Sequence, residues 1–268
     1  MRVIILSDAQ AVGLRAAAMV ATLVRRHPRA VLGLAAGATP LAAYADLVRR
    51  HGEGLDFSAV TVFGLDEYLG LSPDHPASCH LTLRRHLIEK VDIAPVRTHL
   101  LDGTHAGDLI EYCAAHEAAI RAAGGLDLQI LGLGVNGHIG FNEPGCSLGG
   151  ACHVVGLRAS TRATNAPIFP PPEEVPRAAL SMGVGTILAA RRVLLLVTGP
   201  AKADALARAV EGPVTAMVPA SALQLHADAV VLADEAAAAG LRLRADYDAE
   251  VAALGGLPGM ARHFGLEE

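Results

Sequence analysis

One stretch of the sequence decides how the chain is interpreted: Gly132-Leu133-Gly134-Val135-Asn136-Gly137-His138-Ile139-Gly140-Phe141-Asn142-Glu143-Pro144-Gly145. It follows the apolar run 126–131, which has the length and composition of a buried strand. Its glycines and proline prevent it from continuing as a helix. A histidine and a carboxylate therefore lie close together on a turn at the end of a strand, which is typical of an acid/base site.

The same stretch contains glycines at the spacing G-x-G-x-x-G, which is typical of dinucleotide-binding turns when a helix follows and an acidic residue lies about 20 residues further on. Here Pro144 interrupts, and no Asp or Glu occurs between Glu143 and Glu173. We therefore interpret the glycines as a turn that presents His138, flanked by Asn136 and Glu143. The alternative is a structural histidine, the more common role of a lone one.

Short apolar runs alternate with alanine-rich amphipathic runs along the chain. Strands are predicted at 2–6, 30–35, 60–65, 126–131, 193–197 and 229–232. Helices are predicted at 10–26, 41–51, 78–90, 106–123, 182–190, 201–210 and 235–243. The alternation predicts an α/β fold with an open, doubly wound, mostly parallel sheet and helices on both faces, a Rossmann-like three-layer αβα architecture. Ligands of such sheets bind beyond the carboxyl ends of the strands.

The segment 145–176 interrupts this alternation. It is rich in Gly, Ala, Thr and Pro, has no strong periodicity, and is longer than an ordinary connection. Because it follows the turn that carries His138, we predict a lid over the site; the alternative is a plain surface excursion. With no internal repeat and no disordered linker, residues 1–268 are predicted to form a single domain.

The turn after the second predicted strand has the sequence GLAAGATP at 33–40. Thr39 is expected to cap the following helix, and Pro40 suits its first position. The amides of Gly37, Ala38 and Thr39 would then point beyond the strand ends and bind an anion, most naturally a phosphate. The alternative is an ordinary tight turn with a good cap.

Two further strand ends carry charged side chains. Asp66 and Glu67 close the third predicted strand, where a carboxylate is well placed for proton transfer. Taken alone, such a pair is more often a helix cap or a solvated group. Lys202 follows the fifth predicted strand, one turn into a helix, where it either complements an anionic ligand or is solvated. Together these motifs supply the groups needed to transfer protons on a phosphorylated sugar.

Composition and charge argue against several classes of partner. The chain has 268 residues, of which 52% are hydrophobic and 3% aromatic, and a net charge of −5. We expect no nucleic-acid partner and no membrane partner, and no apolar stretch approaches the ~20 residues of a membrane span. Cys79, Cys113, Cys146 and Cys152 form no CxxC pair, and the first apolar run is too short for a signal peptide. We therefore expect a reduced, cytoplasmic setting.

Metal binding is not predicted. Cys79, His75, His80 and His86 could be assembled into ligand sets, but none of these sets has a recognised zinc spacing.

Nearly the whole chain resembles the glucosamine-6-phosphate deaminase (isomerising) family, the glucosamine/galactosamine-6-phosphate isomerases. The matching stretches are 32–40, 63–70, 74–76 with Ser78, 134–144, Thr161-Arg162 with Asn165, 179–188, Lys202 with Glu211-Gly212, and 221–226. The run N-G-H-I-G-F-N-E-P-G is highly specific. The related phosphogluconolactonases share the fold and the G-H core but lack the F-N-E-P continuation.

The resemblance implies conversion of glucosamine 6-phosphate and water to fructose 6-phosphate and ammonia, without an organic cofactor. It implies that Asp66 takes the C2 proton and returns it at C1. His138 is implied to assist opening of the pyranose ring, with Glu143 orienting and electrostatically supporting it. The amides of residues 37–39 and Lys202 are implied to hold the phosphate.

Two departures from the family pattern concern the site. Asn136 stands where some members have an aspartate, so its hydrogen bond to His138 carries no charge and leaves the imidazole less easily protonated. Pro167 stands where members usually have a phosphate-binding arginine, and losing a bidentate contact costs ~1.5–3 kcal/mol. Either Arg158 or Arg162 compensates, or the substrate differs.

A third departure concerns regulation. Family members that are activated by N-acetylglucosamine 6-phosphate bind it through an arginine and a lysine, and the matching positions here are His153 and Val155. We expect no activation of this kind; a sigmoidal rate curve that the acetylated sugar makes hyperbolic would contradict this.

We therefore expect an enzyme that isomerises and deaminates a small-molecule sugar phosphate, with a homo-oligomer left open. The alternatives are a deaminase for another amino-sugar phosphate or related acid, a 6-phosphogluconolactonase-like hydrolase on the same fold, and a sugar-phosphate sensor that kept the pocket.

Overall fold

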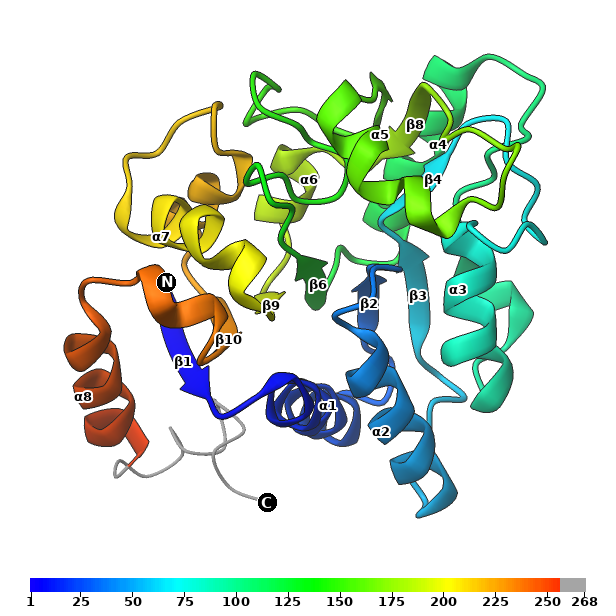
Figure 1. The fold of residues 1–268 in the computed structure, drawn as a ribbon. Helices are drawn as coiled ribbons and strands as arrows, with labels where there is room; N and C mark the ends of the chain where they lie inside the picture. The colour runs from blue at the N-terminus through cyan, green and yellow to red at the C-terminus, as the bar shows by residue number, and fades with distance from the viewer. Residues whose placement is uncertain (256–268) are drawn as a thin grey trace.

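The computed structural model describes residues 1–255. Within this range the centre is a seven-stranded sheet, formed by β1 (Arg2–Leu6), β2 (Val31–Leu34), β3 (Thr61–Gly64), β5 (Thr98–His99), β6 (Leu128–Gly132), β9 (Val193–Val197) and β10 (Ala229–Asp234). The strand order is β1-β10-β9-β6-β2-β3-β5, and all neighbouring pairs are parallel (Figure 1). The predicted α/β fold class, with its mostly parallel sheet, is therefore confirmed.

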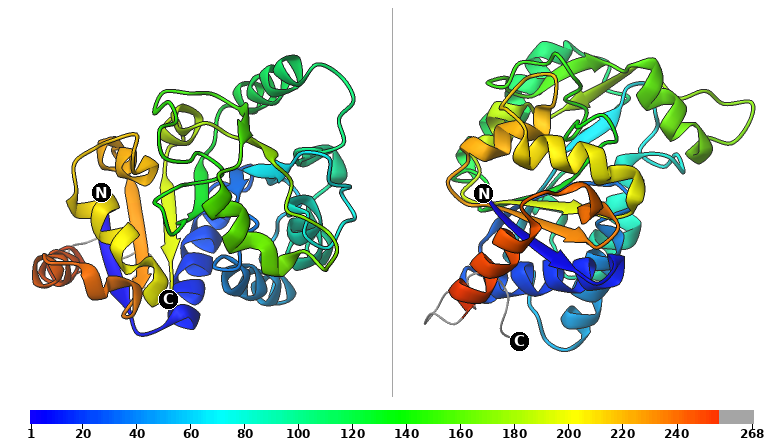
Figure 2. Two further views of the ribbon diagram at one scale, coloured as in Figure 1. Left: turned by 45° about the horizontal axis from the view of Figure 1, so that its top comes forward. Right: turned by 60° about the vertical axis from the view of Figure 1, so that its left-hand side comes forward.

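Helices cover both faces of this sheet, as the two views in Figure 2 show. They are α1 (Ala9–Arg26), α2 (Leu41–Gly52), α3 (Cys79–His86), α4 (Leu109–Ala122), α6 (Val184–Leu188), α7 (Ala203–Glu211) and α8 (Arg244–Gly255). A further helix, α5 (Ala159–Asn165), lies in the segment 145–176. One apolar cluster joins the sheet to α1, α2 and α3, and a second joins it to α4, α6 and α7. No helix within residues 1–255 is long and apolar enough to cross a membrane.

The central strand β9 shows why the sheet has two covered faces. All five of its residues are buried. Val193, Leu195 and Val197 belong to the cluster on the α7 face, whereas Leu194 and Leu196 belong to the cluster on the α1 face. Successive side chains of a strand point to opposite faces, so a continuous apolar run satisfies both layers at once.

A second, three-stranded antiparallel sheet lies beyond the carboxyl ends of the parallel strands. It consists of β4 (Asp66–Tyr68), β8 (Ala178–Ser181) and β7 (His153–Gly156), in the order β4-β8-β7. In Figure 1 it lies past the arrowheads of β2 and β3. β4 follows β3 after a single residue, and Asp66 pairs with Ser181. The second sheet therefore holds Asp66 at the edge of the first.

The segment 145–176 contains more regular structure than the sequence predicts. It includes β7, α5 and a short 3-10 turn, η3 (Ala166–Ile168). β7 has four residues and α5 has seven, which is too short for either to show a periodic pattern in sequence. The pairing of β7 with β8 anchors one part of the segment to the second sheet.

The prediction of a helix at 235–243 was wrong. That range forms only the 3-10 turn η6 (Ala237–Gly240), and the α-helix α8 begins at Arg244. The alanines there favour a helix by propensity. However, the buried carboxylate of Asp234 accepts the amide of Ala237 (2.7 Å), and Ala237 and Ala238 pack into the core in a tighter turn.

The contact between Gly183 and the loop at 149–151 provides a test of how the lid segment is anchored. A Cβ at Gly183 would overlap the carbonyl oxygens of Gly150 and Ala151. We expect Gly183→Ala to lower the free energy of unfolding by about 1–3 kcal/mol, measured by urea denaturation. Gly156→Ala is the matched control because a Cβ there meets no atom. Equal stability of the two variants would contradict this packing.

Candidate functional site

The turn between β2 and α2 presents backbone amides at the carboxyl edge of the sheet. α2 begins at Leu41, and Pro40 occupies the cap position without a side-chain hydrogen bond, so the prediction that Thr39 caps this helix was wrong. A turn precedes the helix, and in it the Leu41 amide donates to the Ala38 carbonyl (3.3 Å). Within residues 1–255 no group accepts a hydrogen bond from the amides of Gly37, Ala38 or Thr39. Amides of this kind at a helix N-terminus bind anions.

Lys202 approaches the same turn from β9. It ends the 3-10 turn η4 (Pro200–Lys202) and occupies the N-cap position of α7. The prediction that it lies one turn inside the helix was therefore wrong. The hydroxyl oxygens of Thr198 and Thr39 lie 3.5 Å apart and join the two strand ends. Burial lowers the pKa of the Lys202 ammonium. A partly buried ammonium beside amide donors is suited to an anionic ligand.

Asp66 lies where the chain passes from the parallel sheet to the second sheet. Burial raises the pKa of its carboxyl group to about 7; a hydrogen bond from the Cys79 thiol acts in the opposite direction, and the charge of Glu67 adds to the increase. A carboxylate is a weak base at its ordinary pKa. At a pKa near neutral it accepts a proton far more readily, which is the property of a general base.

Asn136 determines which ring nitrogen of His138 carries the proton. Its Oδ1 accepts a hydrogen bond from the backbone amide of His138 (3.1 Å) and lies 2.7 Å from Nδ1. Because a backbone amide only donates, this Asn136 atom is the carbonyl oxygen, and Nδ1 is the protonated nitrogen. Nε2 is then an acceptor, and no residue within 1–255 binds it.

The imidazole of His138 is neutral at pH 7. Burial lowers its pKa to about 4; the charge of Glu143 acts against this decrease, and the charge of Lys202 adds to it. A neutral ring with a free Nε2 takes up a proton at that atom.

The glycines around His138 form a turn, as predicted, and two of them have specific roles. The imidazole lies directly on Gly134, where a Cβ would overlap the ring. The Gly134 amide donates to the His138 carbonyl (2.9 Å). Gly137 has φ +87°, a left-handed conformation that favours glycine. Both glycines therefore serve to place the histidine rather than a dinucleotide.

Glu143 is buried and faces the lid segment rather than His138. Its carboxylate accepts hydrogen bonds from the Arg158 amide (2.7 Å) and from the Thr161 hydroxyl. The hydrogen bonds of the His138 ring involve Asn136 and not Glu143. Glu143 therefore acts on His138 through its charge, and it fixes the start of α5 directly.

These elements enclose a cavity of about 520 Å³. Of the predicted site residues, all except Glu143 line it: Gly37, Ala38, Thr39, Asp66, Asn136, His138 and Lys202. From the predicted lid, the side of α5 with Ser160, Thr161 and Thr164 closes the cavity, together with Asn165 and Ile168. The cavity thus brings the Asp66 carboxyl group, the His138 imidazole and the turn with unpaired amides to one space.

Several residues that line the cavity were not predicted from the sequence. Tyr68 lines the cavity, and its hydroxyl accepts a hydrogen bond from Asn165 (2.8 Å), which joins the lid to β4. Thr82 and His86 line it from α3. These residues could have been found from their spacing in the sequence. Tyr68 follows Asp66 by two residues on a strand, and His86 follows Thr82 by four residues on a helix, and each spacing puts both side chains on one face.

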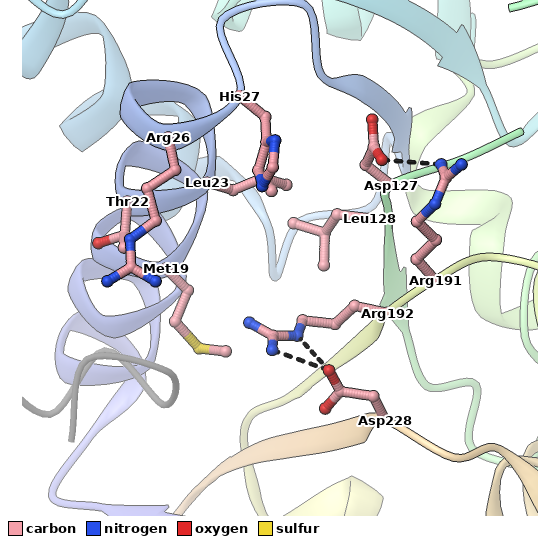
Figure 3. A pocket seen from close by; sticks show the side chains of 10 residues that line it. All are labelled: Met19, Thr22, Leu23, Arg26, His27, Asp127, Leu128, Arg191, Arg192 and Asp228. Carbon is pink, nitrogen blue, oxygen red and sulfur yellow. Dashed lines mark hydrogen bonds and ion pairs between the residues drawn. The ribbon is translucent and has the colours of Figure 1, made fainter. Parts of the chain in front are cut away.

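Another cavity, of about 490 Å³, lies at the opposite, amino-terminal end of the strands. It is lined by Met19, Thr22, Leu23, Arg26, His27, Asp127, Leu128, Arg191, Arg192 and Asp228 (Figure 3). Arg191 is paired with Asp127 (2.8 Å), and Arg192 with Asp228 (2.8 Å). None of the predicted site residues lines it, and ligands of parallel sheets bind at the other end.

The residues considered for metal binding do not converge. No group of three His, Cys, Asp or Glu side chains within residues 1–255 is placed to hold a metal ion. His75 contacts Glu173 instead, with Nε2 2.7 Å from the carboxylate.

A parallel α/β sheet with a carboxyl group, an imidazole and unpaired backbone amides beyond its strand ends is typical of enzymes that act on small anionic ligands. The chain belongs to the family of glucosamine-6-phosphate isomerases/6-phosphogluconolactonase, whose model matches residues 7–232.

Relatives of known name resemble the chain over most of its length. A glucosamine-6-phosphate deaminase of Arthrobacter sp. (strain FB24) is 51% identical over 248 residues, which cover 92% of this chain and 95% of the relative. A protein of the same name from Hahella chejuensis is 47% identical, over 91% of this chain and 93% of the relative.

Solved structures give the same picture of the fold. A monomeric glucosamine-6-phosphate deaminase superposes with a TM-score of 0.87 at 42% identity, covering 90% of this chain and all of the other. The 6-phosphogluconolactonase of Trypanosoma brucei superposes with a TM-score of 0.73 at 19% identity, covering 90% of this chain and 98% of the other. The second likeness extends to the fold alone.

The raised pKa of Asp66 predicts a pH-dependent cost to stability. In the folded protein this carboxyl group binds its proton more tightly than in the unfolded chain, so stability decreases as the pH rises from about 4 to about 7. Asp66→Asn removes the buried charge. We expect it to be more stable than the wild type by on the order of 2 kcal/mol at pH 8, with little gain at pH 4.

Thermal unfolding of both proteins across this pH range measures the difference. Glu174→Gln, which changes an exposed acid, is the control and should give no such trend. A gain for Asp66→Asn that does not vary with pH would contradict the raised pKa.

Proposed function

We propose that this protein is a glucosamine-6-phosphate deaminase: it converts glucosamine 6-phosphate and water to fructose 6-phosphate and ammonia. The observation that carries the proposal is the shared cavity, which Asp66, His138 and the anion-binding turn all line. The deaminases that resemble this chain over nine-tenths of its length support the same reaction.

His138 opens the pyranose ring in this proposal. Nδ1 is held protonated by Asn136, so Nε2 accepts the proton of the C1 hydroxyl and delivers it to the ring oxygen as the C1–O5 bond breaks. The products of this step are the C1 aldehyde and the C5 hydroxyl. A neutral imidazole is required at its start, and the low pKa of His138 supplies it.

Asp66 then moves one proton between adjacent carbons. Its carboxylate removes the proton from C2, the electrons of that bond form a C1=C2 double bond, and the aldehyde oxygen takes a proton from water, which gives an enolamine and a hydroxide ion. The carboxyl group returns its proton to C1, and the nitrogen lone pair forms a C2=N bond, which leaves an iminium ion at C2. The hydroxide ion adds to C2, and the hydroxyl proton moves to the nitrogen as ammonia leaves, which completes the ketone, fructose 6-phosphate. A base held beside C2 lowers the barrier by positioning.

We propose that the phosphate binds the amides of residues 37–39 and Lys202. Pro167 lies on an exposed turn, and neither Arg158 nor Arg162 lines the cavity. The Arg158 guanidinium instead donates to the Pro144 carbonyl. In place of the missing lid arginine, the phosphate therefore binds the turn at residues 37–39, the Lys202 ammonium, and the hydroxyl groups of α5. The remote phosphate supplies binding energy that positions C1 and C2.

The remaining parts of the proposal concern the setting of the enzyme. We propose that the chain acts as a single domain in the cytoplasm, without an organic cofactor or metal. The proposal leaves a homo-oligomer open.

The direct test is ammonia release from the purified protein. Glucosamine 6-phosphate should give ammonia and fructose 6-phosphate in equal amounts, and Asp66→Asn should lower kcat by at least about 10²-fold. Galactosamine 6-phosphate, with tagatose 6-phosphate as the product, tests the epimer. Hydrolysis of 6-phosphogluconolactone without ammonia release, or binding without turnover, would overturn the proposal in favour of a lactonase or a sensor.

The two perturbed pKa values predict the acid side of the pH profile. Asp66 must be ionised, with a pKa of about 7, and His138 must be neutral, with a pKa of about 4. We expect kcat/KM to fall about tenfold per pH unit below pH 7, because only one group titrates there. The substrate's own titration, followed by phosphorus NMR, is subtracted first. A profile that stays flat down to pH 5 would contradict the role of Asp66.

A further inference from the structure

The neighbour of the proposed base, Glu67, is a buried carboxylate with no part in the reaction described so far. It is 1% exposed, and it lies beside Asp66 on β4. Successive side chains of a strand alternate, so Asp66 points into the cavity while Glu67 points away from it, toward α3. No lysine, arginine or histidine within residues 1–255 forms an ion pair with Glu67.

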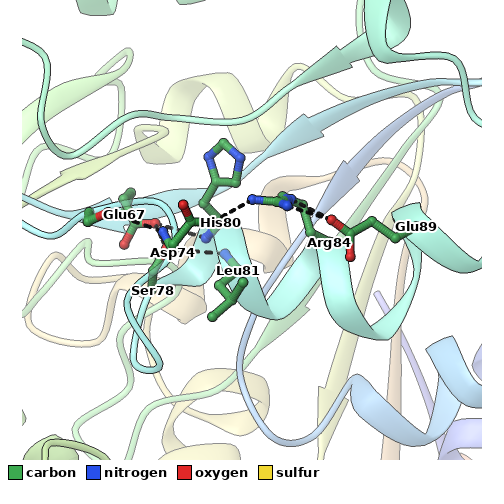
Figure 4. A network of polar contacts seen from close by, with 8 residues as sticks. Glu67, Asp74, Ser78, His80, Leu81, Arg84 and Glu89 are labelled. Atoms are coloured by element: carbon green, nitrogen blue, oxygen red, sulfur yellow. Dashed lines mark hydrogen bonds and ion pairs between the residues drawn. The ribbon is translucent and has the colours of Figure 1, made fainter.

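Four neutral donors surround this carboxylate, and two of them, Ser78 and His80, are labelled in Figure 4. Oε1 accepts hydrogen bonds from the amides of Tyr68 (2.7 Å) and Cys79 (3.2 Å). Oε2 accepts the Ser78 hydroxyl (2.6 Å) and the amide of His80 (2.8 Å). The Ser78 oxygen accepts a hydrogen bond from the Leu81 amide (3.2 Å), and the Ser78 hydroxyl donates its proton in the hydrogen bond to Glu67. The carboxylate therefore fastens the first turn of α3 to β4.

This connection controls the wall that faces the base. Cys79, Thr82 and His86 are spaced on one side of α3, and all three line the cavity. The Cys79 thiol donates to Asp66, while the Cys79 amide donates to Glu67. One buried side chain thus sets both the strand that carries the base and the helix that packs against it.

Glu67 also places a negative charge next to the base. Hydrogen bonds from neutral dipoles stabilise this charge without cancelling it, as a cation would. A carboxylate so placed disfavours a second negative charge on Asp66. The other titratable groups around Asp66 are the phenols of Tyr44 and Tyr68 and the Cys79 thiol, and His86, His138 and Lys202 line the same cavity.

We propose that Glu67 is a positioning residue for proton transfer: it holds Asp66 and the cavity-facing side of α3 in register, and its buried charge acts on Asp66. The proposal rests on the deaminase function only in naming the reaction that Asp66 performs. Glu67 does not touch the substrate.

Two substitutions distinguish the effect of the Glu67 charge from the effect of the length of its side chain. Glu67→Gln removes the charge and nearly keeps the length, whereas Glu67→Asp keeps the charge and shortens the side chain. For Glu67→Gln we expect the acid limb of kcat/KM to move to lower pH by roughly half a unit or more. For Glu67→Asp we expect an unmoved limb and a kcat lowered by about tenfold, with a smaller change in KM. A purely structural role would lower the active fraction of both variants and move neither limb.

A second readout does not depend on turnover. Carbon-13 NMR of aspartate-labelled protein follows the Asp66 carboxyl, assigned by its loss in Asp66→Asn, and its midpoint should also move to lower pH in Glu67→Gln. An unmoved limb and midpoint in Glu67→Gln, or wild-type kcat and KM in Glu67→Asp, would overturn the proposal. If Glu67→Gln does not fold, Glu67→Asp decides. If the wild type releases no ammonia, the proposed function fails, and the Asp66 midpoints still decide the role of Glu67.

Discussion

The site depends on the partial burial of one carboxyl group, that of Asp66, beside the cavity. The chain leaves the parallel sheet at Leu65 and enters the second sheet at Asp66, so this side chain lies between the two sheets and faces the cavity. Its burial is not offset by a cation, and the negative Glu67 is its neighbour in sequence. A carboxyl group with a pKa near neutral lowers stability at neutral pH, and it suits the role of general base that we propose for Asp66.

The sequence was sufficient for six of the seven strands of the parallel sheet, all except the two-residue β5, and for most of the cavity lining. Strands such as 193–197 are continuous apolar runs, and buried parallel strands have this signature. Parallel strands end at one edge, so residues that follow different strands, such as His138 and Lys202, were expected to meet. The resemblance to a known family added the order of the chemical steps, which spacing alone does not provide.

Other features depend on contacts between distant segments and could not be predicted. The second sheet joins strands of three and four residues, whose patterns are too short to recognise. Glu143 was expected beside His138, but its hydrogen bonds go to Arg158 and Thr161, because the lid segment folds back over it. The protonated nitrogen of His138 follows from a single side chain, Asn136, whose orientation is visible only in three dimensions.

The central claim is that Asp66 transfers the C2 proton of the amino sugar to C1. The most direct measurement is proton NMR of glucosamine 6-phosphate and its product in deuterium oxide, with wild-type protein and with Asp66→Asn. The account predicts that the wild type introduces deuterium at C1 of fructose 6-phosphate, and that Asp66→Asn exchanges no proton at C2 while still binding the sugar phosphate. Exchange at C2 that survives in Asp66→Asn would show that another group is the base.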